Sequence, residues 1–494
     1  MKWALLSVWD KTGILDLAKA LVEADYGILS SGGTGAALRD AGIPYTDVAT
    51  YTGSPEMMHG RVKTLHPKIH GGILGRRGID DAVMAEHGIE PIDIVAVNLY
   101  PFEEMQARGL DLEELVEFID IGGPAMVRAA AKNHEHVAII VDPSDYPMAI
   151  DAVRSGGFSP EQRQKLAATA FARTAAYDGS IANYMTGIDC PFPEVLTLQF
   201  RGGRALRYGE NPHQQAAVYG DTGIAAEAPL QGKQMSYNNY LDVNAAVGLL
   251  REFDEPCAVV VKHNNPCGVA TGDRLLDAYV AAREVDPVSA YGSIVALNRE
   301  VTREVAEEIT KTFVEVVVAP SFAPDALEVM KQKENMRILR LPTPLTQDEV
   351  RMIDGGILLQ RTPGYRETWQ VVSEREPTAH EMRAMLLAWK VCKHTKSNTI
   401  IFANESAVVG IGAGQMSRVD SAKIAIEKAG TPLEGTAVAS DAFLPFPDTL
   451  EVAAAAGATA LVQPGGSIRD DEVIAAANRL DIAMIFTGVR YFRH

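Results

Sequence analysis

The sequence contains few cysteines, fewer positive than negative charges, and no long apolar run. The four cysteines lie far apart, which excludes a disulfide framework and is typical of a reducing compartment, so we expect a cytoplasmic protein. No apolar run approaches the length of a membrane span. The net charge of −18 argues against non-specific binding to nucleic acid. We therefore expect neither a membrane nor a nucleic acid as a partner. The cysteines are Cys190, Cys257, Cys267 and Cys392.

The chain has 494 residues, of which 47% are hydrophobic, and this length is sufficient for roughly three compact cores. Its first stretch, "MKWALLSVWDKTG", has an apolar run that ends at Asp10 and is too short for the core of a signal peptide. The run instead predicts a strand over Trp3–Val8. Asp10 is suited to cap a helix from Thr12 to about Ala24.

Strand and helix patterns alternate over the first 190 residues. The stretches "GILS", "IDIVAVNLY" and "HVAIIV" predict buried strands, and "SGGTGAALRDAG" predicts a glycine turn that opens a helix. Such alternation indicates a parallel sheet with helices on both faces. A long helix is predicted over Ser159–Met185, and "GIDCPFPE" after it is predicted to be a linker. We therefore place one domain over residues 1–190 and a second region over residues 191–494.

A pattern of strand, loop and helix occurs twice in the second region, at Lys262 and at Ser397. Around the second of these, "TIIFANESAVVGIGAGQMSR" predicts two strands about a turn, followed by a glycine loop and a helix. No string of residues is repeated, but the shared pattern suggests a duplicated α/β unit.

Two segments of the first domain are suited to bind an anion. In "SSGGTG", Ser30–Gly35, glycines allow backbone N–H groups to face a phosphate at a helix N-terminus, although a simple tight turn is about as good an interpretation. "GRVKTLHPKIHGG" concentrates basic residues, and if it is extended, Arg61 and Lys63 share a face and can clamp one anion. The alternative is a solvated basic loop. A zinc site at His66 and His70 is a poor fit because the intervening proline would break the required helix.

Polar side chains follow a predicted strand at "NLYPF", which places Asn98 and Tyr100 where α/β folds bind ligands. Tyr100 covering the edge of the core is an equally good interpretation. Further along, "IDIGGPAMVRAAAKNH" provides Asp120, a glycine pair, a proline suited to the first position of a helix, and Lys132. Lys132 is either a cation at a helix end or a lysine tuned to act as a base.

The stretch "EPCAVVVKHNNPCGVATG" predicts a buried strand that ends in Lys262 and His263 and breaks at the next residues. Burying an ammonium group is costly, so a lysine at this place calls for a reason. A metal site, an acid–base pair and an ordinary strand end are the three interpretations.

Many segments together resemble one enzyme family, the bifunctional AICAR transformylase/IMP cyclohydrolases of purine biosynthesis. The similarity extends over essentially the whole chain. One departure is Trp9, where the family more often has a small or polar residue. The segments that carry the resemblance are "SVWDKTG", "SGGTG", "GRVKTLHPKIHGGIL", "NLYPF", "IDIGGPAMVRAAAKNH", "RYGENPHQ", "KHNNPCG", "SNTIIF", "GIGAGQMSR", "SDAFLPF" and "VRYFRH".

The resemblance implies two reactions. The C-terminal region would transfer a formyl group from 10-formyltetrahydrofolate to AICAR, and the N-terminal domain would close formyl-AICAR to IMP with loss of water. The fold class is then α/β, with an N-terminal methylglyoxal-synthase-like parallel-sheet domain and a C-terminal half of two cytidine-deaminase-like α/β units. The resemblance also implies a homodimer and a folate cosubstrate. Neither reaction demands a metal or a permanently bound cofactor.

This fold class makes it possible to weigh the interpretations of the Lys262 segment. A zinc deaminase needs H-x-E and P-C-x-x-C signatures. Here Asn265 stands where the glutamate is needed, and no second cysteine follows Cys267. The acid–base pair is therefore favoured, with His263 as the base and Lys262, as in the family, stabilising the transition state. Both can serve one site only if the strand ends there.

The resemblance assigns the remaining site residues by motif position. Catalytic roles fall to Lys262, His263 and Asn398 in the transformylase, and to Lys63, Tyr100, Asp120 and Lys132 in the cyclohydrolase. Substrate-binding roles fall to Ser7, Lys11, Ser31, Gly32, Gly33, Thr34, Arg61, Thr64, Asn98, Ile121, Arg207, Tyr208, Asn239, Glu315, Phe443, Pro445 and Arg490. The competing classes are a zinc-dependent nucleotide deaminase and a non-catalytic nucleotide- or folate-binding regulator.

Overall fold

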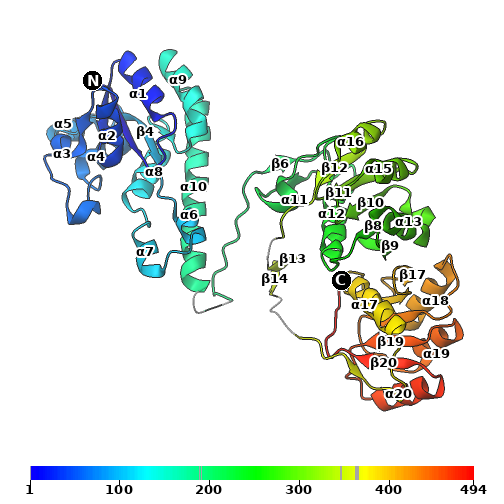
Figure 1. Cartoon of the computed structure of the whole chain (residues 1–494). Helices are drawn as coiled ribbons and strands as arrows, with labels where there is room; N and C mark the ends of the chain where they lie inside the picture. The colour runs from blue at the N-terminus through cyan, green and yellow to red at the C-terminus, as the bar shows by residue number, and fades with distance from the viewer. Residues whose placement is uncertain (1, 188–189, 191, 345–347, 362–365) are drawn as a thin grey trace. The chain divides into compact units, whose positions relative to one another are not determined.

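The computed structural model of the chain describes residues 2–187, 190, 192–344, 348–361 and 366–494 (Figure 1). Contacts between residues divide the chain into two compact units, Met1–Gln199 and Phe200–His494. The predicted linker, Gly187–Glu194, lies partly outside the described residues. Residues 197–199 pack back on the first unit, since the Asn183 side chain donates to the Thr197 carbonyl at 2.8 Å.

The first unit is built on one five-stranded sheet in the order β3-β2-β1-β4-β5, in which every neighbouring pair is parallel. Its strands are β1 (Lys2–Val8), β2 (Tyr26–Ser30), β3 (Thr46–Asp47), β4 (Ile92–Asn98) and β5 (Ala138–Ile140). Because β1 connects to β2 on one side and β4 to β5 on the other, right-handed crossovers put their helices on opposite faces. The parallel sheet predicted from the alternating pattern is confirmed.

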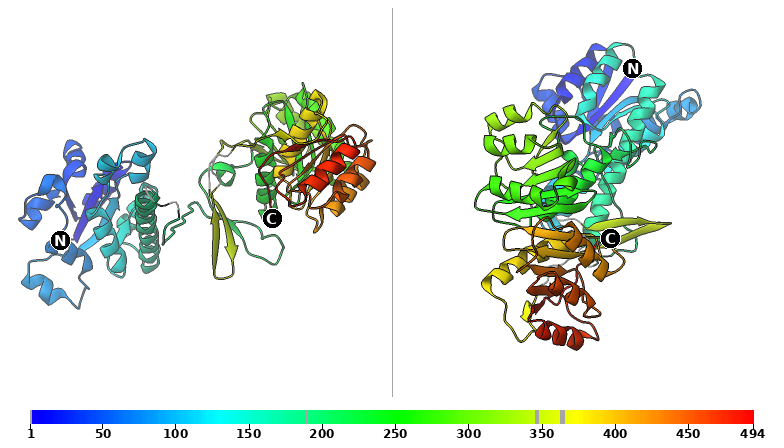
Figure 2. Two further views of the ribbon diagram at one scale, coloured as in Figure 1. Left: turned by 90° about the horizontal axis from the view of Figure 1, so that it is seen from below. Right: turned by 90° about the vertical axis from the view of Figure 1, so that its right-hand side faces the viewer.

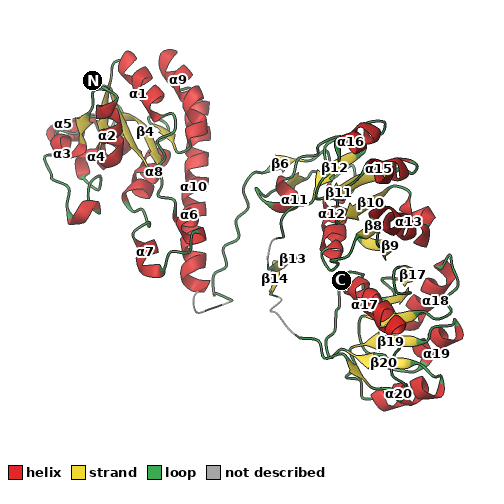
Figure 3. Ribbon diagram, in the orientation of Figure 1, coloured by secondary structure: helices red, strands yellow, loops and turns green. Residues whose placement is uncertain are grey.

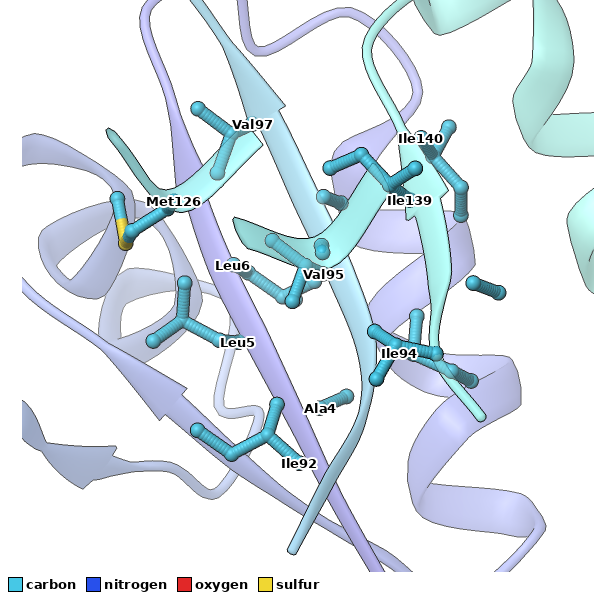
Figure 4. Close-up of a cluster of buried hydrophobic side chains, with 14 of the residues drawn as sticks. Ala4, Leu5, Leu6, Ile92, Ile94, Val95, Val97, Met126, Ile139 and Ile140 are labelled. Atoms are coloured by element: carbon cyan, nitrogen blue, oxygen red, sulfur yellow. The ribbon is translucent and has the colours of Figure 1, made fainter. Parts of the chain in front are cut away.

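Helices cover this sheet and bury its apolar strands (Figure 3). Figure 4 shows side chains of β1, β4 and β5 meeting the helix α8, where Leu5, Val95 and Met126 are at most 1% exposed. The helical elements are α1 (Ile14–Glu23), α2 (Gly32–Asp40), α3 (Val48–Thr52), η1 (Met58–Gly60), α4 (Pro67–Leu74), α5 (Asp81–Glu86), α6 (Phe102–Ala107), α7 (Leu112–Val116), α8 (Gly122–Lys132), η2 (Pro143–Asp145), α9 (Tyr146–Arg154) and α10 (Pro160–Gly187).

The strand order of this sheet indicates where a ligand would bind. The order reverses between β1 and β4, so the loops after these two strands turn to opposite sides and leave a crevice at their carboxyl ends. Ser7, near the end of β1, is paired with Val97 in β4. Residues directly after β1 and β4 therefore lie at the position where open α/β sheets bind ligands.

Several local predictions in this unit need correction. Asp10 accepts from the Thr12 N–H at 2.9 Å, but the helix begins only at Ile14, after Gly13 in a left-handed conformation. The basic segment is not extended, because it forms η1 and a turn before α4 begins. Pro67 does not break a helix but starts α4, with the His66 side chain as its cap. The glycine pair, and not the proline after it, opens α8.

The second unit contains two sheets with the same strand order. The first sheet runs β12-β11-β10-β8-β9, and the second runs β20-β19-β18-β16-β17 with β15 added at its edge. In each sheet an antiparallel hairpin is followed by three parallel strands, and the first hairpin strand pairs antiparallel with the third strand. The duplication that the sequence suggested is thus confirmed by topology.

The elements of the first repeat are α12 (Tyr237–Leu250), β8 (Cys257–Lys262), β9 (Asn265–Thr271), α13 (Leu275–Val285), α14 (Pro287–Ala290), β10 (Ser293–Leu297), α15 (Arg303–Thr310), β11 (Val314–Ala319), α16 (Pro324–Met330) and β12 (Arg337–Arg340). Those of the second repeat are β15 (Gln370–Val371), α17 (Ala379–Lys393), β16 (Ile400–Ala403), β17 (Val408–Gly412), α18 (Arg418–Lys428), β18 (Ala437–Ser440), α19 (Asp448–Ala455), β19 (Ala460–Gln463), α20 (Asp470–Arg479) and β20 (Ala483–Phe486). Outside the repeats lie β6 (Arg204–Ala205), β7 (Ala217–Val218), α11 (Gly223–Ala226), β13 (Glu349–Ile353) and β14 (Gly356–Gln360).

The two repeats share one core. Buried residues of α12 and α17 form a single cluster with one face of each sheet, so these helices lie between the sheets (Figure 2). The edges also meet, because the Thr271 N–H donates to the Ser406 carbonyl at 2.7 Å and Ala270 bridges to Ala407. The hairpins β8–β9 and β16–β17 are consequently fixed against each other.

The segment after Lys262 was predicted as a break, and this is wrong beyond Asn264. His263 and Asn264 have φ of 51° and 62° and form a two-residue hairpin turn, after which β9 pairs with β8. Pro266 is tolerated because β9 is an edge strand and the ladder shifts register opposite it. The strand still ends at Lys262, as the acid–base interpretation requires.

An ion pair at the start of α17 stabilises the second repeat. Burial alone would raise the pKa of the Glu381 carboxyl, but hydrogen bonds from Arg375 and Thr378 lower it to about 2. Since this value lies below the ordinary 4.5, the stability it contributes is present above pH 4.5 and is lost as the pH falls toward 2.

We expect Glu381→Gln to lower the free energy of unfolding of this unit at pH 7 by about 2 kcal/mol, the usual value of charged hydrogen bonds. The difference from the parent should shrink at pH 3. Urea unfolding at both pH values measures it, with Glu376→Gln, on an exposed neighbour, as the control. An equal loss at both pH values would contradict the assignment to the ionised carboxyl.

Two features of the described residues concern the membrane and zinc predictions. Among the described residues, no helix is both long and apolar enough to cross a membrane. Nor do three or more histidine, cysteine, aspartate or glutamate side chains come together in that part of the chain as a group that could hold a metal ion.

Candidate active sites

The N-terminus of α2 and two lysines together form an anion-binding group in the first unit. A methyl group added at Gly32 would lie 3.4 Å from Lys63 Nζ, and one added at Gly33 would lie 3.4 Å from Lys11 Nζ. Both ammonium groups therefore stand over the first turn of α2, whose N–H groups carry partial positive charge. This combination suits a phosphate, and it favours the phosphate interpretation over a simple tight turn.

Acidic side chains neutralise part of the basic segment. Lys63 pairs with Glu56 at 3.0 Å, and Arg61 pairs with Glu117. Both acidic partners come from outside the basic segment. Lys63 nevertheless faces the α2 turn, while Arg61 is exposed and bound to Glu117 next to α7.

Two side chains predicted to bind substrate, those of Thr34 and Asn98, also hold the loop after β1. The Thr34 hydroxyl bonds both the N–H and the carbonyl of Val8 at 3.0 Å. Asn98 Oδ1 accepts from the N–H groups of Trp9 and Asp10, and its Nδ2 donates to the Asp10 carbonyl at 2.8 Å. These contacts shape the crevice and use much of the hydrogen-bonding capacity of the Thr34 and Asn98 side chains.

A second helix N-terminus faces the same crevice. Asp120 Oδ1 accepts from the Gly123 N–H at 2.8 Å at the start of α8, and the Tyr100 backbone N–H also bonds this carboxyl. Burial raises the pKa of Asp120, against the lowering effect of these two N–H groups. The Thr64 hydroxyl lies 2.8 Å from the position of a methyl group at Gly122. The Tyr100 backbone and the side chains of Asp120 and Thr64 are thus brought together at the start of α8, where Ile121 is exposed.

Lys132 is not brought to this group. It is the last residue of α8, whereas the residues just described surround its first turn. A helix of that length separates its two ends by about 15 Å. Lys132 is exposed, and its catalytic role continues to rest on motif position alone.

In the second unit, the hairpin turn after β8 presents Lys262 and His263 next to each other. Lys262 Nζ donates to the Tyr291 carbonyl at 2.7 Å, and the His263 side chain is exposed. Asp242 in α12 accepts from the Asn264 N–H at 2.7 Å and lies close enough to His263 for their charges to interact. Sequence reasoning missed Asp242, because a single acidic residue within an apolar helix carries no motif.

Asn398 belongs to the same region. Its Nδ2 donates to the carbonyls of Gln415 at 2.9 Å and Met416 at 3.1 Å, and a cis peptide bond joins it to Ser397. Asn265 Oδ1, next to the histidine turn, accepts from the Lys396 N–H at 3.1 Å. This bond places the turn that carries Lys262 and His263 beside the segment that leads through Asn398 into β16.

The C-terminal tail completes this region. The Ser397 N–H donates to the Arg493 carbonyl at 2.9 Å, and the Tyr491 N–H donates to the Asp441 carbonyl at 3.0 Å. The tail thus connects the Asn398 segment with the loop of Phe443 and Pro445, both of which are half-buried. Arg490 stands 4.5 Å from the centre of the Phe492 ring.

A buried network that the sequence did not reveal fixes the tail. Glu367 accepts from the Tyr491 hydroxyl at 2.6 Å and pairs with Lys393 at 3.1 Å. His394, in contact with Arg493 at 3.4 Å, pairs with Glu252 at the end of α12. The pKa of His394 is lowered chiefly by burial. Because these residues come from both repeats, only the folded chain brings them together.

The remaining predicted residues lie around the first repeat. Asn239 is buried in the first turn of α12, where its side chain accepts from the Ser236 N–H, and it lies one turn before Asp242. The Asn238 side chain donates to the Glu210 carbonyl, which brings the segment with exposed Arg207 and half-buried Tyr208 to this turn. Glu315 is paired with Arg337 at 2.6 Å. It lies two strands from β8 at the same sheet edge, about 10 Å away.

Fold and sites together define a two-unit α/β enzyme class, with a crevice in a parallel sheet and a second site between duplicated hairpins. The family model described as "MGS-like domain" matches residues 13–125 of this chain. The model described as "AICARFT/IMPCHase bienzyme" matches residues 130–428. The chain belongs to the AICARFT/IMPCHase bienzyme family, and its first unit contains the MGS-like domain.

Curated relatives match over nearly the full length. A protein of Sorangium cellulosum (strain So ce56) called bifunctional purine biosynthesis protein PurH is 51% identical, covering 99% of this chain and 99% of its own. A protein of the same name from Rhodospirillum rubrum is 52% identical, covering 99% of this chain and 98% of its own. The family that the sequence motifs indicated is therefore confirmed.

Proposed function

We propose that this chain catalyses formyl transfer from 10-formyltetrahydrofolate to AICAR in its second unit and closure of formyl-AICAR to IMP in its first. The observation that carries the proposal is the hydrogen bond between Asn265 and Lys396, which places the turn of Lys262 and His263 beside the segment of Asn398. Full-length similarity to proteins named for purine biosynthesis supports it. We further propose a homodimer in the cytoplasm, with no permanently bound cofactor.

In the transfer step, the 5-amino nitrogen of AICAR forms a bond to the formyl carbon while His263 takes its proton. The bond from that carbon to the folate nitrogen then breaks, and this nitrogen gains a proton from Lys262. His263 is the suitable base because imidazole titrates near neutrality. Lys262 also places a cation beside the oxyanion that forms between these events. Asn398 orients the amine through its amide, and arginines such as Arg207 and Arg490 bind the phosphate.

In the closure step, the carboxamide nitrogen forms a bond to the formyl carbon. The formyl oxygen leaves as water, with one proton from the carboxamide nitrogen and one from the formamide nitrogen. Lys11, Lys63 and the turn of α2 hold the phosphate. Tyr100 and Asp120 orient the two reacting groups at the α8 end of the crevice.

The direct test incubates the purified protein with AICAR and 10-formyltetrahydrofolate and follows tetrahydrofolate and IMP. Turnover to both is the expected result. Binding of both ligands without turnover would support a regulator instead. Zinc present in equal amount with the protein, and lost together with activity, would support a zinc-dependent deaminase.

A fragment of residues 1–199 should cyclise formyl-AICAR but transfer no formyl group. The boundary follows the compact unit, because residues up to Gln199 bind back to α10. The measurement is IMP formation by the fragment from formyl-AICAR, with circular dichroism to establish that it folds. Cyclisation that needs residues beyond 200, in a folded dimeric fragment, would contradict the assignment of activities to units.

The resemblance predicts that Lys132→Ala blocks cyclisation alone, so that formyl-AICAR accumulates while formyl transfer continues. Arg128→Ala, on the same helix, is the matched control. Product analysis by chromatography distinguishes the two nucleotides. Normal IMP production by the Lys132 variant would remove this residue from the mechanism, in agreement with its place at the far end of α8.

A further inference from the structure

Trp9 is a large exposed aromatic residue at the crevice of the first unit. It follows β1 directly, and its side chain is 45% exposed. Its backbone is held at two points, since its N–H donates to Asn98 Oδ1 at 2.5 Å and its carbonyl accepts from Lys11 Nζ at 3.1 Å. Single exposed hydrophobic residues are common, but this one is fixed by groups that also shape the ligand site.

The Trp9 ring contacts two other aromatic rings. It meets Tyr100 edge to face at 5.3 Å between ring centres and 64° between planes. It meets Phe118 at 6.1 Å and 78°. These are favourable arrangements for aromatic pairs. Trp9, Tyr100 and Phe118, which we call the aromatic wall, come from the ends of β1 and β4 and from the segment before α8.

The anion-binding group and the Tyr100 end of the aromatic wall lie on opposite sides of β1, and Trp9 directly follows that strand. The anion-binding group follows β2, and the Tyr100 end of the wall stands toward β4, with β1 between them. Two strand spacings amount to about 10 Å. The wall is therefore within reach of the heterocycle of a nucleotide whose phosphate is bound at α2.

We propose that Trp9 is a positioning residue for cyclisation, which holds Tyr100 in place and packs against the imidazole ring of the bound nucleotide. The inference rests on the proposed cyclohydrolase function of this unit. Lys11 and Lys63 provide charge for the phosphate, whereas the wall provides an apolar face for the uncharged end. Removing the indole should therefore affect the reacting end more than phosphate binding.

Cyclisation kinetics of three variants test this proposal. Trp9→Ser should lower kcat for formyl-AICAR closure by roughly 3- to 10-fold, the value of an aromatic pair, while Trp9→Phe should keep most of the rate. Formyl transfer, in the other unit, should not change. Trp3→Phe is the matched control, because Trp3 lies near the start of β1, the strand that Trp9 follows. A kcat within error of the parent in Trp9→Ser would overturn the proposal.

Fluorescence gives a second readout that a merely structural role would not change. The chain has four tryptophans, and Trp389 is buried in the second unit. Titration with IMP should change the emission of the parent and of Trp3→Phe, but not that of Trp9→Phe. An IMP signal that persists in Trp9→Phe would contradict contact between the indole and the nucleotide.

Failure of this inference can be told from failure of the proposed function. A parent protein that does not cyclise formyl-AICAR would remove the cyclohydrolase assignment itself. A parent that cyclises, together with an equally active and equally stable Trp9→Ser, would remove only the role of Trp9. Thermal unfolding of each variant shows whether a lower rate reflects lost folded protein.

Discussion

His263→Ala should lower kcat for formyl transfer by roughly 10²–10⁴-fold, the usual contribution of a positioned base. The histidine occupies an exposed hairpin turn beside Lys262, so its removal takes away the proton acceptor without opening the core. AICAR binding should change much less, because arginine contacts to the phosphate dominate affinity. Steady-state kinetics with separate determination of KM measures both.

The matched control is His380→Ala, which removes an exposed histidine from the second repeat of the same unit. It should retain formyl transfer. Cyclisation of formyl-AICAR should be intact in both variants, since it is assigned to the other unit. A His263 variant with full formyl transfer would leave the turn as an ordinary hairpin and return Lys262 to a structural role.

Lys63→Ala should lower kcat/KM for closure of formyl-AICAR by roughly 10- to 100-fold, as expected for loss of a charged hydrogen bond. Its ammonium lies over the first turn of α2, where it adds to the partial positive charge of the helix N-terminus. Because a phosphate is bound equally in the ground and transition states, most of the loss should be in KM.

Lys68→Ala is the control for Lys63, because it removes the same charge from the same basic segment but from within α4. Lys63→Arg should recover part of the affinity. Calorimetric titration with IMP measures binding without turnover. Unchanged IMP affinity in Lys63→Ala would contradict a phosphate site at α2. It would also contradict the expected direction of the nucleotide across β1.

Much of the fold was predictable because its pattern is local. The run Ile92–Asn98 is apolar enough to be a buried strand wherever it lies, and glycines after β2 mark a turn into a helix. The hairpin at His263 was missed because Asn265–Thr271 contains a proline and a glycine, which locally disfavour a strand. Pairing with β8 and with the loop of the second repeat outweighs this preference.

For the candidate sites too, the sequence determined one part and the tertiary structure another. Residue types and their order along the chain determined the family, the two sets of site motifs and the candidates Lys262 and His263, because chemistry needs particular side chains at particular spacings. Tertiary structure decided which of them meet. Asn98 and Thr34 hold a loop, Lys132 lies at the far end of its helix, and Asp242 adjoins the histidine turn.

Tertiary structure decided which residues meet because function depends on distances between segments, and no local stretch of sequence encodes these distances. The order β3-β2-β1-β4-β5 places the crevice between β1 and β4, which are more than eighty residues apart in the chain. Contact of Trp9 with Tyr100 follows from that order and from no motif. Likewise, the equivalent hairpins of the two repeats lie against each other because α12 and α17 bury their apolar faces together between the sheets.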